Sequence, residues 1–304
     1  YVRRPVRAVN EPLYRGKAKY FWDPAWCASD FFLDSANPHI LFYVAIGWLT
    51  RFLTLAQTAH VGRWIALTLL ATGWHRLGRS VGIAGWSATA TAALFMVLAA
   101  YGNFAGEWLI GGVEGKVFAY ACLMWGAAAW HGRRWIAAAV WTAAAIGFHP
   151  VVGIWSVAAS LFAVALGRLR REDAAVDRGP SKPGERRQLI VACCTFVLIG
   201  LAGLWPALAM LSGVDPELAK TADRITLTWR LGHHLDPLLF PGSSYRYYAV
   251  LLAAAAGLSL VRSHTSGVRG LQRYVLGALL IAAAGLCVGW APRVTSLDPL
   301  HPLR

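Results

Sequence analysis

Long apolar segments recur along nearly the whole chain, and short polar links separate them. Eight of these segments are candidates to cross a membrane, at residues 61–77, 83–101, 113–131, 134–148, 151–167, 189–211, 247–262 and 273–290. Charged residues make up only 14% of the chain, whereas a soluble domain of this size carries about 25%. The sequence therefore predicts an all-α protein, a polytopic transmembrane helical bundle with about eight spanning helices.

Several of these segments are short for a membrane span. Their apolar centres hold about 14 residues, which gives ~21 Å of helix against a hydrocarbon layer of ~30 Å. They cross it only if flanking side chains such as Lys116, Arg133 and Arg134 extend toward the headgroups. We therefore expect these basic residues at the membrane boundary.

The distribution of basic residues sets the expected orientation. The link 168–188 holds seven Lys and Arg residues and is predicted to be a cytoplasmic loop. If each segment crosses the membrane, three further basic links fall on the same side, at Arg76/Arg79, Arg133/Arg134 and Arg262/Arg269/Arg273. These four links contain only four of the 15 acids. Residues 61–304 are thus predicted to be the membrane bundle, and residues 1–60 an outward-facing first loop.

Residues 40–56, ILFYVAIGWLTRFLTLA, form a further apolar run that is short and interrupted. Gly47 lies near its middle, and Thr50 and Arg51 lie one turn before its end. If this run spans, the residues before it are cytoplasmic; if it lies in the interface, they face outward with most of the acids. We expect a juxtamembrane helix that is interfacial or re-entrant.

Several polar residues precede this run, in the stretch DFFLDSANPHILFY at 30–43. Asn37, followed by proline, is a favourable N-cap for a helix that runs from His39. Asp30 is either the cap of a short helix after it or a catalytic carboxylate. Asp34 and His39 are not needed as caps, which makes them candidates for a binding site.

A second polar group lies in the predicted outward stretch 101–120, around GGVEGK. This is not a phosphate-binding P-loop, because the earlier glycine and the hydroxyl residue after the lysine are missing. Glu114 and Lys116 are either an interfacial anchor at a helix start or a binding site in which Lys116 contacts a lipid phosphate.

Histidines lie in two further outward links. His149, in FHPVVGIW, lies at the membrane boundary, where an imidazole needs a partner or water, so it is either structural or part of a site. His233 belongs to the adjacent pair in WRLGHHLDPLLFPG; such neighbours point apart, and we expect no metal site. Nucleic-acid binding is not expected either, because the basic residues are mainly in the links.

We expect these polar residues to line one cavity at the outer face. The candidates for substrate binding are Asp34, His39, Glu114, Lys116, His149 and His233. The candidates for the catalytic base are Glu11 and Asp30. A carboxylate accepts the proton of an attacking hydroxyl while cations hold a phosphate leaving group. At a lipid–water boundary, this combination suits a lipid-linked, phosphate-bearing substrate.

Residues 10–53, together with GGVEGKVFAY and FHPVVGIW, resemble an uncharacterised bacterial multi-pass family of the GT-C type of integral-membrane glycosyltransferases. The resemblance covers most of residues 10–160. It implies a GT-C-like bundle in the bacterial inner membrane and transfer of a sugar from a polyprenyl-phosphate donor at the outer face. It also implies acidic catalytic residues in the first loop, which Glu11 and Asp30 match, and a further helix upstream of Tyr1.

Other functions remain open, because fold does not fix function. The chain is alternatively a transporter or lipid-handling protein that uses the cavity without chemistry, or a structural membrane subunit. The expected partners are membrane lipid and a polyprenyl-phosphate-linked sugar; the sequence identifies no protein partner. It requires no metal or other cofactor, although a divalent metal is compatible with such a reaction.

Overall fold

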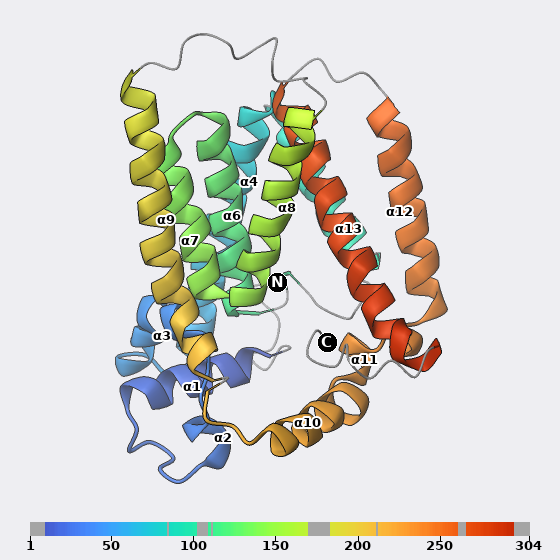
Figure 1. The fold of residues 1–304 in the computed structure, drawn as a ribbon. Helices are drawn as coiled ribbons and strands as arrows, with labels where there is room; N and C mark the ends of the chain where they lie inside the picture. The colour runs from blue at the N-terminus through green and yellow to red at the C-terminus, as the bar shows by residue number, and fades with distance from the viewer. Residues whose placement is uncertain are drawn as a thin grey trace. The chain divides into compact units, whose positions relative to one another are not determined.

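A computed structural model describes residues 10–83, 85–101, 109–110, 112–169, 183–210, 212–260 and 266–294 (Figure 1). Every regular element in these ranges is helical, which confirms the predicted all-α class. Each of the eight predicted apolar segments forms a helix: α4 (Leu55–Ser80), α5 (Trp86–Tyr101), α6 (Gly115–His131), α7 (Trp135–Phe148), α8 (Pro150–Leu169), α9 (Pro183–Ala209), α12 (Gly242–Leu260) and α13 (Ser266–Val294).

Three helical segments among the described residues are long and apolar enough to cross a membrane: Pro150–Leu169, Gly184–Ala209 and Gly267–Val288. Two others, Trp86–Ala99 and Trp135–Phe148, are apolar but shorter. The surface of α9 is correspondingly apolar, with Leu198, Leu201 and Trp205 exposed. Large apolar side chains on the outside of a helix indicate that lipid covers them. The chain therefore has the features of a membrane protein.

The chain divides into two compact units. The first contains residues 1–88, 109–157 and 174–212, and the second contains residues 89–108, 158–173 and 213–304. In the first unit, α4, α6, α7 and α9 pack side by side in that order (Figure 1). Glycines allow the closest approach: a Cβ placed on Gly203 of α9 would lie 2.7 Å from the Cα of Gly147 on α7. Small residues at such crossings are typical of membrane helix pairs.

Within the first unit, the basic links meet at one end of the bundle. Arg133, after α6, forms a salt bridge of 2.6 Å with Glu185 at the start of α9. Arg76 and Arg79, near the end of α4, line a pocket together with Arg134. Three links that the sequence places on one side are thus brought together, although residues 170–182 of the loop 168–188 lie outside the described ranges.

The other end of this bundle is covered by α1 (Glu11–Trp22), α2 (Phe31–Asp34), α3 (Ile40–Ala45) and the 3-10 helix η1 (Gly47–Arg51) (Figure 1). Residues 40–56 therefore form two short pieces and the first residues of α4, not one helix. Their position in the membrane interface stays a prediction. The predicted cap at Asn37 is wrong: α3 begins at Ile40 with His39 as its N-cap, and the Asn37 side chain accepts a hydrogen bond from the His39 N–H. Asn37 forms this local turn because its short amide reaches the backbone two residues later.

Helix α1 was not expected, because its sequence EPLYRGKAKYFW lacks an apolar stripe. Its burial is inverted: Glu11, Arg15 and Lys17 are buried, while Leu13 and Phe21 are about half exposed. Glu11 in the first turn and Lys19 in the last turn both complement the helix dipole. A helix that turns its charges inward needs polar partners in the protein: Arg63 of α4 pairs with Glu11, and Ser35 accepts hydrogen bonds from Lys17.

The second unit contains α10 (Pro216–Ile225), the π-helical turn η2 (Thr226–Arg230), α11 (Gly232–Leu235) and η3 (Pro237–Leu239) in addition to α12 and α13. Asp215 caps α10 by accepting hydrogen bonds from the N–H groups of Glu217 and Leu218. Gly277 of α13 lies against α8, where an added Cβ would meet the carbonyl oxygen of Ala159 at 2.9 Å.

Candidate functional site

A buried ion pair between α1 and α4 is the centre of the candidate site. Arg63 donates two hydrogen bonds to the Glu11 carboxylate, from Nε to Oε1 at 2.8 Å and from a terminal nitrogen to Oε2 at 2.7 Å. Both side chains are fully buried. The backbone N–H of Val113, just before α6, donates a third hydrogen bond to Oε1 at 2.9 Å. Both oxygens of Glu11 are thus held by donors, in the bidentate geometry that favours an arginine partner.

Arg15 adds a second guanidinium one turn along α1. A terminal nitrogen lies 3.8 Å from Glu11 Oε2, and Arg15 also donates to the carbonyl oxygens of Glu11 and Leu55. Burial lowers the pKa of Arg15, and the adjacent Glu11 opposes that shift. Arginine remains protonated in proteins, so this region holds two permanent positive charges against one Glu11 carboxylate.

Glu114 and Lys116 extend this group at the start of α6. Lys116 Nζ lies 3.2 Å from Glu114 Oε2, and both side chains are at least nine-tenths buried. The N–H of Asn10, next to Glu11, donates to Glu114 Oε1 at 3.3 Å. We define the charged cluster as Glu11, Arg15, Arg63, Glu114 and Lys116. It carries three cations and two carboxylates inside an apolar helical unit.

His39 lies beside the charged cluster and links three segments. Its Nδ1 is 3.1 Å from the carbonyl oxygen of Phe148, and its Nε2 is 3.3 Å from the Tyr14 hydroxyl. A carbonyl oxygen only accepts, so Nδ1 carries the proton and Nε2 accepts from Tyr14. Burial lowers the pKa of His39, with the Phe148 carbonyl opposing the shift and Lys17 adding to it. His39 is therefore a neutral imidazole at pH 7.

His149 and Gly115 complete this part of the site. The rings of His39 and His149 lie 5.1 Å apart, and His149 Nδ1 accepts from the Val152 N–H at 3.4 Å. Gly115 separates Glu114 from Lys116, and a Cβ on it would lie 2.4 Å from the Phe148 carbonyl oxygen and 3.3 Å from His39 Nδ1. Only glycine permits α6 to start this close to the end of α7.

The structure brings together five of the eight residues that the sequence singled out: Glu11, His39, Glu114, Lys116 and His149. Asp30 is exposed and caps α2 by accepting from the Leu33 N–H at 2.9 Å, which is the structural alternative that the sequence left open. Asp34 accepts a hydrogen bond from the Tyr20 hydroxyl at 3.1 Å. It lies near Ser35, which binds Lys17 of α1, and not with the five residues above. His233 lies in α11, in the second unit.

Sequence reasoning missed three residues of the site, namely Arg63, Arg15 and Tyr14. Arg63 left a detectable signal, because it lies just inside the predicted span 61–77 and a charge there is expensive unless it is paired. Arg15 and Tyr14 left none, because they become neighbours of Glu11 and His39 only once α1 is a helix. Among the described residues, no group of three or more His, Cys, Asp or Glu side chains has metal-binding geometry.

The chemistry of this site follows from its charges and its neutral imidazole. Three cations in a low-dielectric setting favour an anionic ligand group, and Glu114 and His39 supply proton acceptors beside them. In the ranges that the structure describes, the regular elements are all helical, three of the helices are suited to a membrane, and a buried charged cluster lies at one end of the first unit. Comparison with models of known families, with curated proteins and with solved structures found no match to this chain.

Proposed function

We propose that the chain is a multi-pass protein of the bacterial inner membrane that handles a lipid-linked, phosphate-bearing substrate at the outer end of its bundle. The observation that carries this proposal is the burial of Glu11, Arg15, Arg63, Glu114 and Lys116 together in one helical unit. Ionisable groups at membrane depth are expensive and mark substrate sites by default. The excess of one cation in the cluster favours a phosphate group as ligand.

We further propose a GT-C-like reaction, in which a sugar passes from a polyprenyl-phosphate donor to the hydroxyl of an acceptor. The hydroxyl oxygen forms a bond to the anomeric carbon, and the bond from that carbon to the phosphate oxygen breaks. The leaving phosphate keeps the electron pair and is stabilised by Lys116, while a carboxylate takes the hydroxyl proton. Eight membrane spans, including the shorter helices, are part of this proposal.

The contacts of the two buried carboxylates assign them different roles. Glu11 is engaged by Arg63 through both oxygens and by the Val113 N–H, so its role is to hold Arg63 and the start of α6 in place. Glu114 lies 3.2 Å from Lys116, the cation proposed to hold the phosphate, and only Gly115 separates the two residues in the chain. We therefore favour Glu114 as the base, because it lies beside the cation that stabilises the leaving phosphate. Its burial means that the substrate reaches it when this end of the bundle opens.

A carrier function without chemistry is the second candidate, and the engagement of Glu11 favours it. A carboxylate whose two oxygens are engaged by an arginine and a backbone amide serves the fold and not a substrate hydroxyl. On this alternative, the charged cluster binds the lipid phosphate, and the substrate leaves unchanged. Asp30, as an exposed helix cap, has no role in either function beyond stability.

The experiment uses the purified chain in lipid vesicles with a polyprenyl-phosphate sugar, and it measures binding and sugar release separately. Lys116→Met should weaken binding at least tenfold, whereas Lys220→Met, which removes an exposed lysine of α10, should not. Glu114→Gln should reduce transfer about 10²–10⁴-fold without loss of binding. Its control is Glu185→Gln, which breaks the pair with Arg133 at the other end. Binding without release by the unaltered protein selects the carrier function. Equal binding by the Lys116 and Lys220 variants overturns the site.

A further inference from the structure

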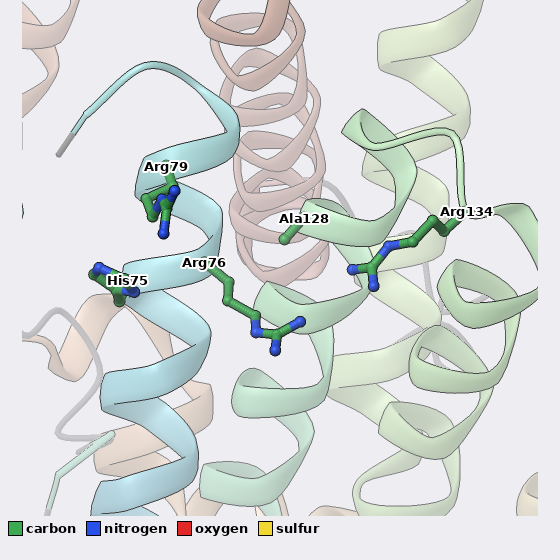
Figure 2. Close-up of a pocket in the computed structure, with 5 residues that line it drawn as sticks. All are labelled: His75, Arg76, Arg79, Ala128 and Arg134. Atoms are coloured by element: carbon green, nitrogen blue, oxygen red, sulfur yellow. The ribbon is translucent and has the colours of Figure 1, made fainter.

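A basic pocket lies at the end of α4 and α6 that is opposite to the charged cluster. Its volume is about 380 Å³, and it is lined by His75, Arg76, Arg79, Ala128 and Arg134 (Figure 2). Arg63 and Arg76 are 13 residues apart on α4, which places them about 20 Å apart along the helix. This basic pocket is therefore separate from the site of the proposed function.

The charges of the basic pocket are all of one sign. Three guanidinium groups and one imidazole line it, and no acidic residue does. Within the part of the chain that the structure describes, no carboxylate forms a salt bridge with Arg76, Arg79 or Arg134. The neighbouring Arg133 shows the contrast, because it is paired with Glu185 at 2.6 Å. These three arginines are exposed, so water and salt screen part of their mutual repulsion, and an anion in the hollow relieves the rest.

One of these cations, Arg76, is held between the two helices. The Arg76 guanidinium lies over the ring of Trp125 on α6, 4.2 Å from its centroid, a contact that fixes a long side chain. Figure 2 shows Arg76 extending from α4 toward α6, and Arg134 extending toward Ala128 from the link after α6. Ala128 is buried and small, so the space between these two guanidinium groups stays open. His75 and Arg79 are one turn apart on α4.

We propose that this basic pocket binds a phosphate group, carried either by the headgroup of an anionic phospholipid or by a free phosphate. A guanidinium offers paired N–H donors that match two phosphate oxygens, and a phosphate has enough oxygens to bind several guanidinium groups at once. Basic pockets between membrane helices on the cytoplasmic side hold anionic headgroups in this way. The predicted orientation places this pocket on the cytoplasmic side, where its helix ends meet the headgroup layer.

The test uses the purified full-length chain in phosphatidylcholine nanodiscs. Phosphatidylglycerol is added in one arm and inorganic phosphate in the other, and binding is followed by native mass spectrometry and by the thermal unfolding midpoint. The double variant Arg76→Gln/Arg134→Gln should weaken phosphate-group binding at least about tenfold, because it removes two charge-assisted contacts. Its control is Arg186→Gln/Arg187→Gln, which removes two exposed arginines from the start of α9. The control should retain binding within about twofold.

Each outcome decides the proposal. Selective uptake of phosphatidylglycerol that phosphate does not displace identifies a lipid headgroup as the source. Stabilisation by inorganic phosphate alone identifies a free phosphate as the source. Either result supports the pocket if the Arg76/Arg134 variant no longer shows it and the Arg186/Arg187 variant still does. Equal losses in the two double variants overturn the proposal, because the general positive field of this face then explains the binding. Absence of binding in both arms also overturns it. If the double variant does not fold, Arg79→Gln at the exposed end of α4 replaces it.

Discussion

Arg63 of α4 holds both carboxylate oxygens of Glu11 of α1, at 2.8 and 2.7 Å, although the two residues are 52 positions apart in the chain. Neither side chain is exposed. This pair fastens the N-terminal helix to the bundle, and through the Val113 N–H it also fixes the segment that leads into α6. The pair therefore sets the geometry of the whole charged cluster.

Removal of one partner of this pair should destabilise the protein strongly. Glu11→Gln leaves the Arg63 charge buried without a carboxylate, and such a loss costs about 3–5 kcal/mol. The double variant Glu11→Gln/Arg63→Met should recover only part of this, because it removes the Arg63 charge but leaves Arg15 without its carboxylate. The measurement is the free energy of unfolding in detergent. Asp30→Asn is the control, since asparagine is also a good cap. A Glu11→Gln protein as stable as the control would contradict the structural role of the pair.

Gly115 should not tolerate a side chain. Gly115→Ala places a Cβ 2.4 Å from the backbone oxygen of Phe148, and backbone at both ends leaves little room to move. Overpacking of this kind costs about 1–3 kcal/mol. Gly184→Ala is the matched change, because an added Cβ there meets nothing within 4 Å. Thermal unfolding should separate the two variants. Equal midpoints would show that α6 and α7 do not approach as closely as described.

The stability of the protein should decrease on acidification below pH 6.5, and His39 should contribute to this decrease. Burial lowers the pKa of His39 below its ordinary 6.5 in the folded chain. As the pH falls below 6.5, the unfolded chain takes up a proton that the folded chain does not, and the free energy of unfolding decreases. Above pH 6.5, His39 is neutral in both states and this effect vanishes.

His39→Gln isolates this effect from the other titrating groups. A glutamine amide donates to the Phe148 carbonyl and accepts from Tyr14, but it does not titrate. Unfolding midpoints of both proteins are measured between pH 7.5 and pH 5. The loss on acidification should be smaller in His39→Gln than in the unaltered protein. Parallel curves would rule out His39 as the source.

The two ends of the first unit should lie on opposite sides of the membrane. Cys27, which is exposed in the turn after α1, should react with a membrane-impermeant thiol reagent added from outside. In a Cys27→Ser background, Gly184→Cys at the start of α9 should react only after the membrane is opened. Labelling of both positions from one side would contradict the alternation of spans and the outward placement of the charged cluster.

The helical class was predictable because it follows from local sequence. Apolar runs of sufficient length form helices wherever backbone groups cannot bond to water, and each of the eight predicted segments is a helix. The sequence also predicted that the basic links of the first unit lie together at one end, because they occur after every second apolar segment. The helix α1 was not predictable, because its burial follows from partners elsewhere in the fold, Arg63 of α4 above all, and not from any stripe of its own.

The residue types of the candidate site were visible in the sequence, but their roles depended on tertiary contacts. Asp30 and Glu11 looked alike as acids in one N-terminal segment, yet the first is an exposed cap and the second a buried partner of Arg63. His39 and His149 are 110 positions apart and meet because the start of α3 lies against the end of α7. The sequence alone determined the helices, since these depend on hydrophobicity along the chain. Only the tertiary structure decided which charges are paired, because an ion pair forms only when two side chains come within a few ångströms of each other, and helix packing sets that distance.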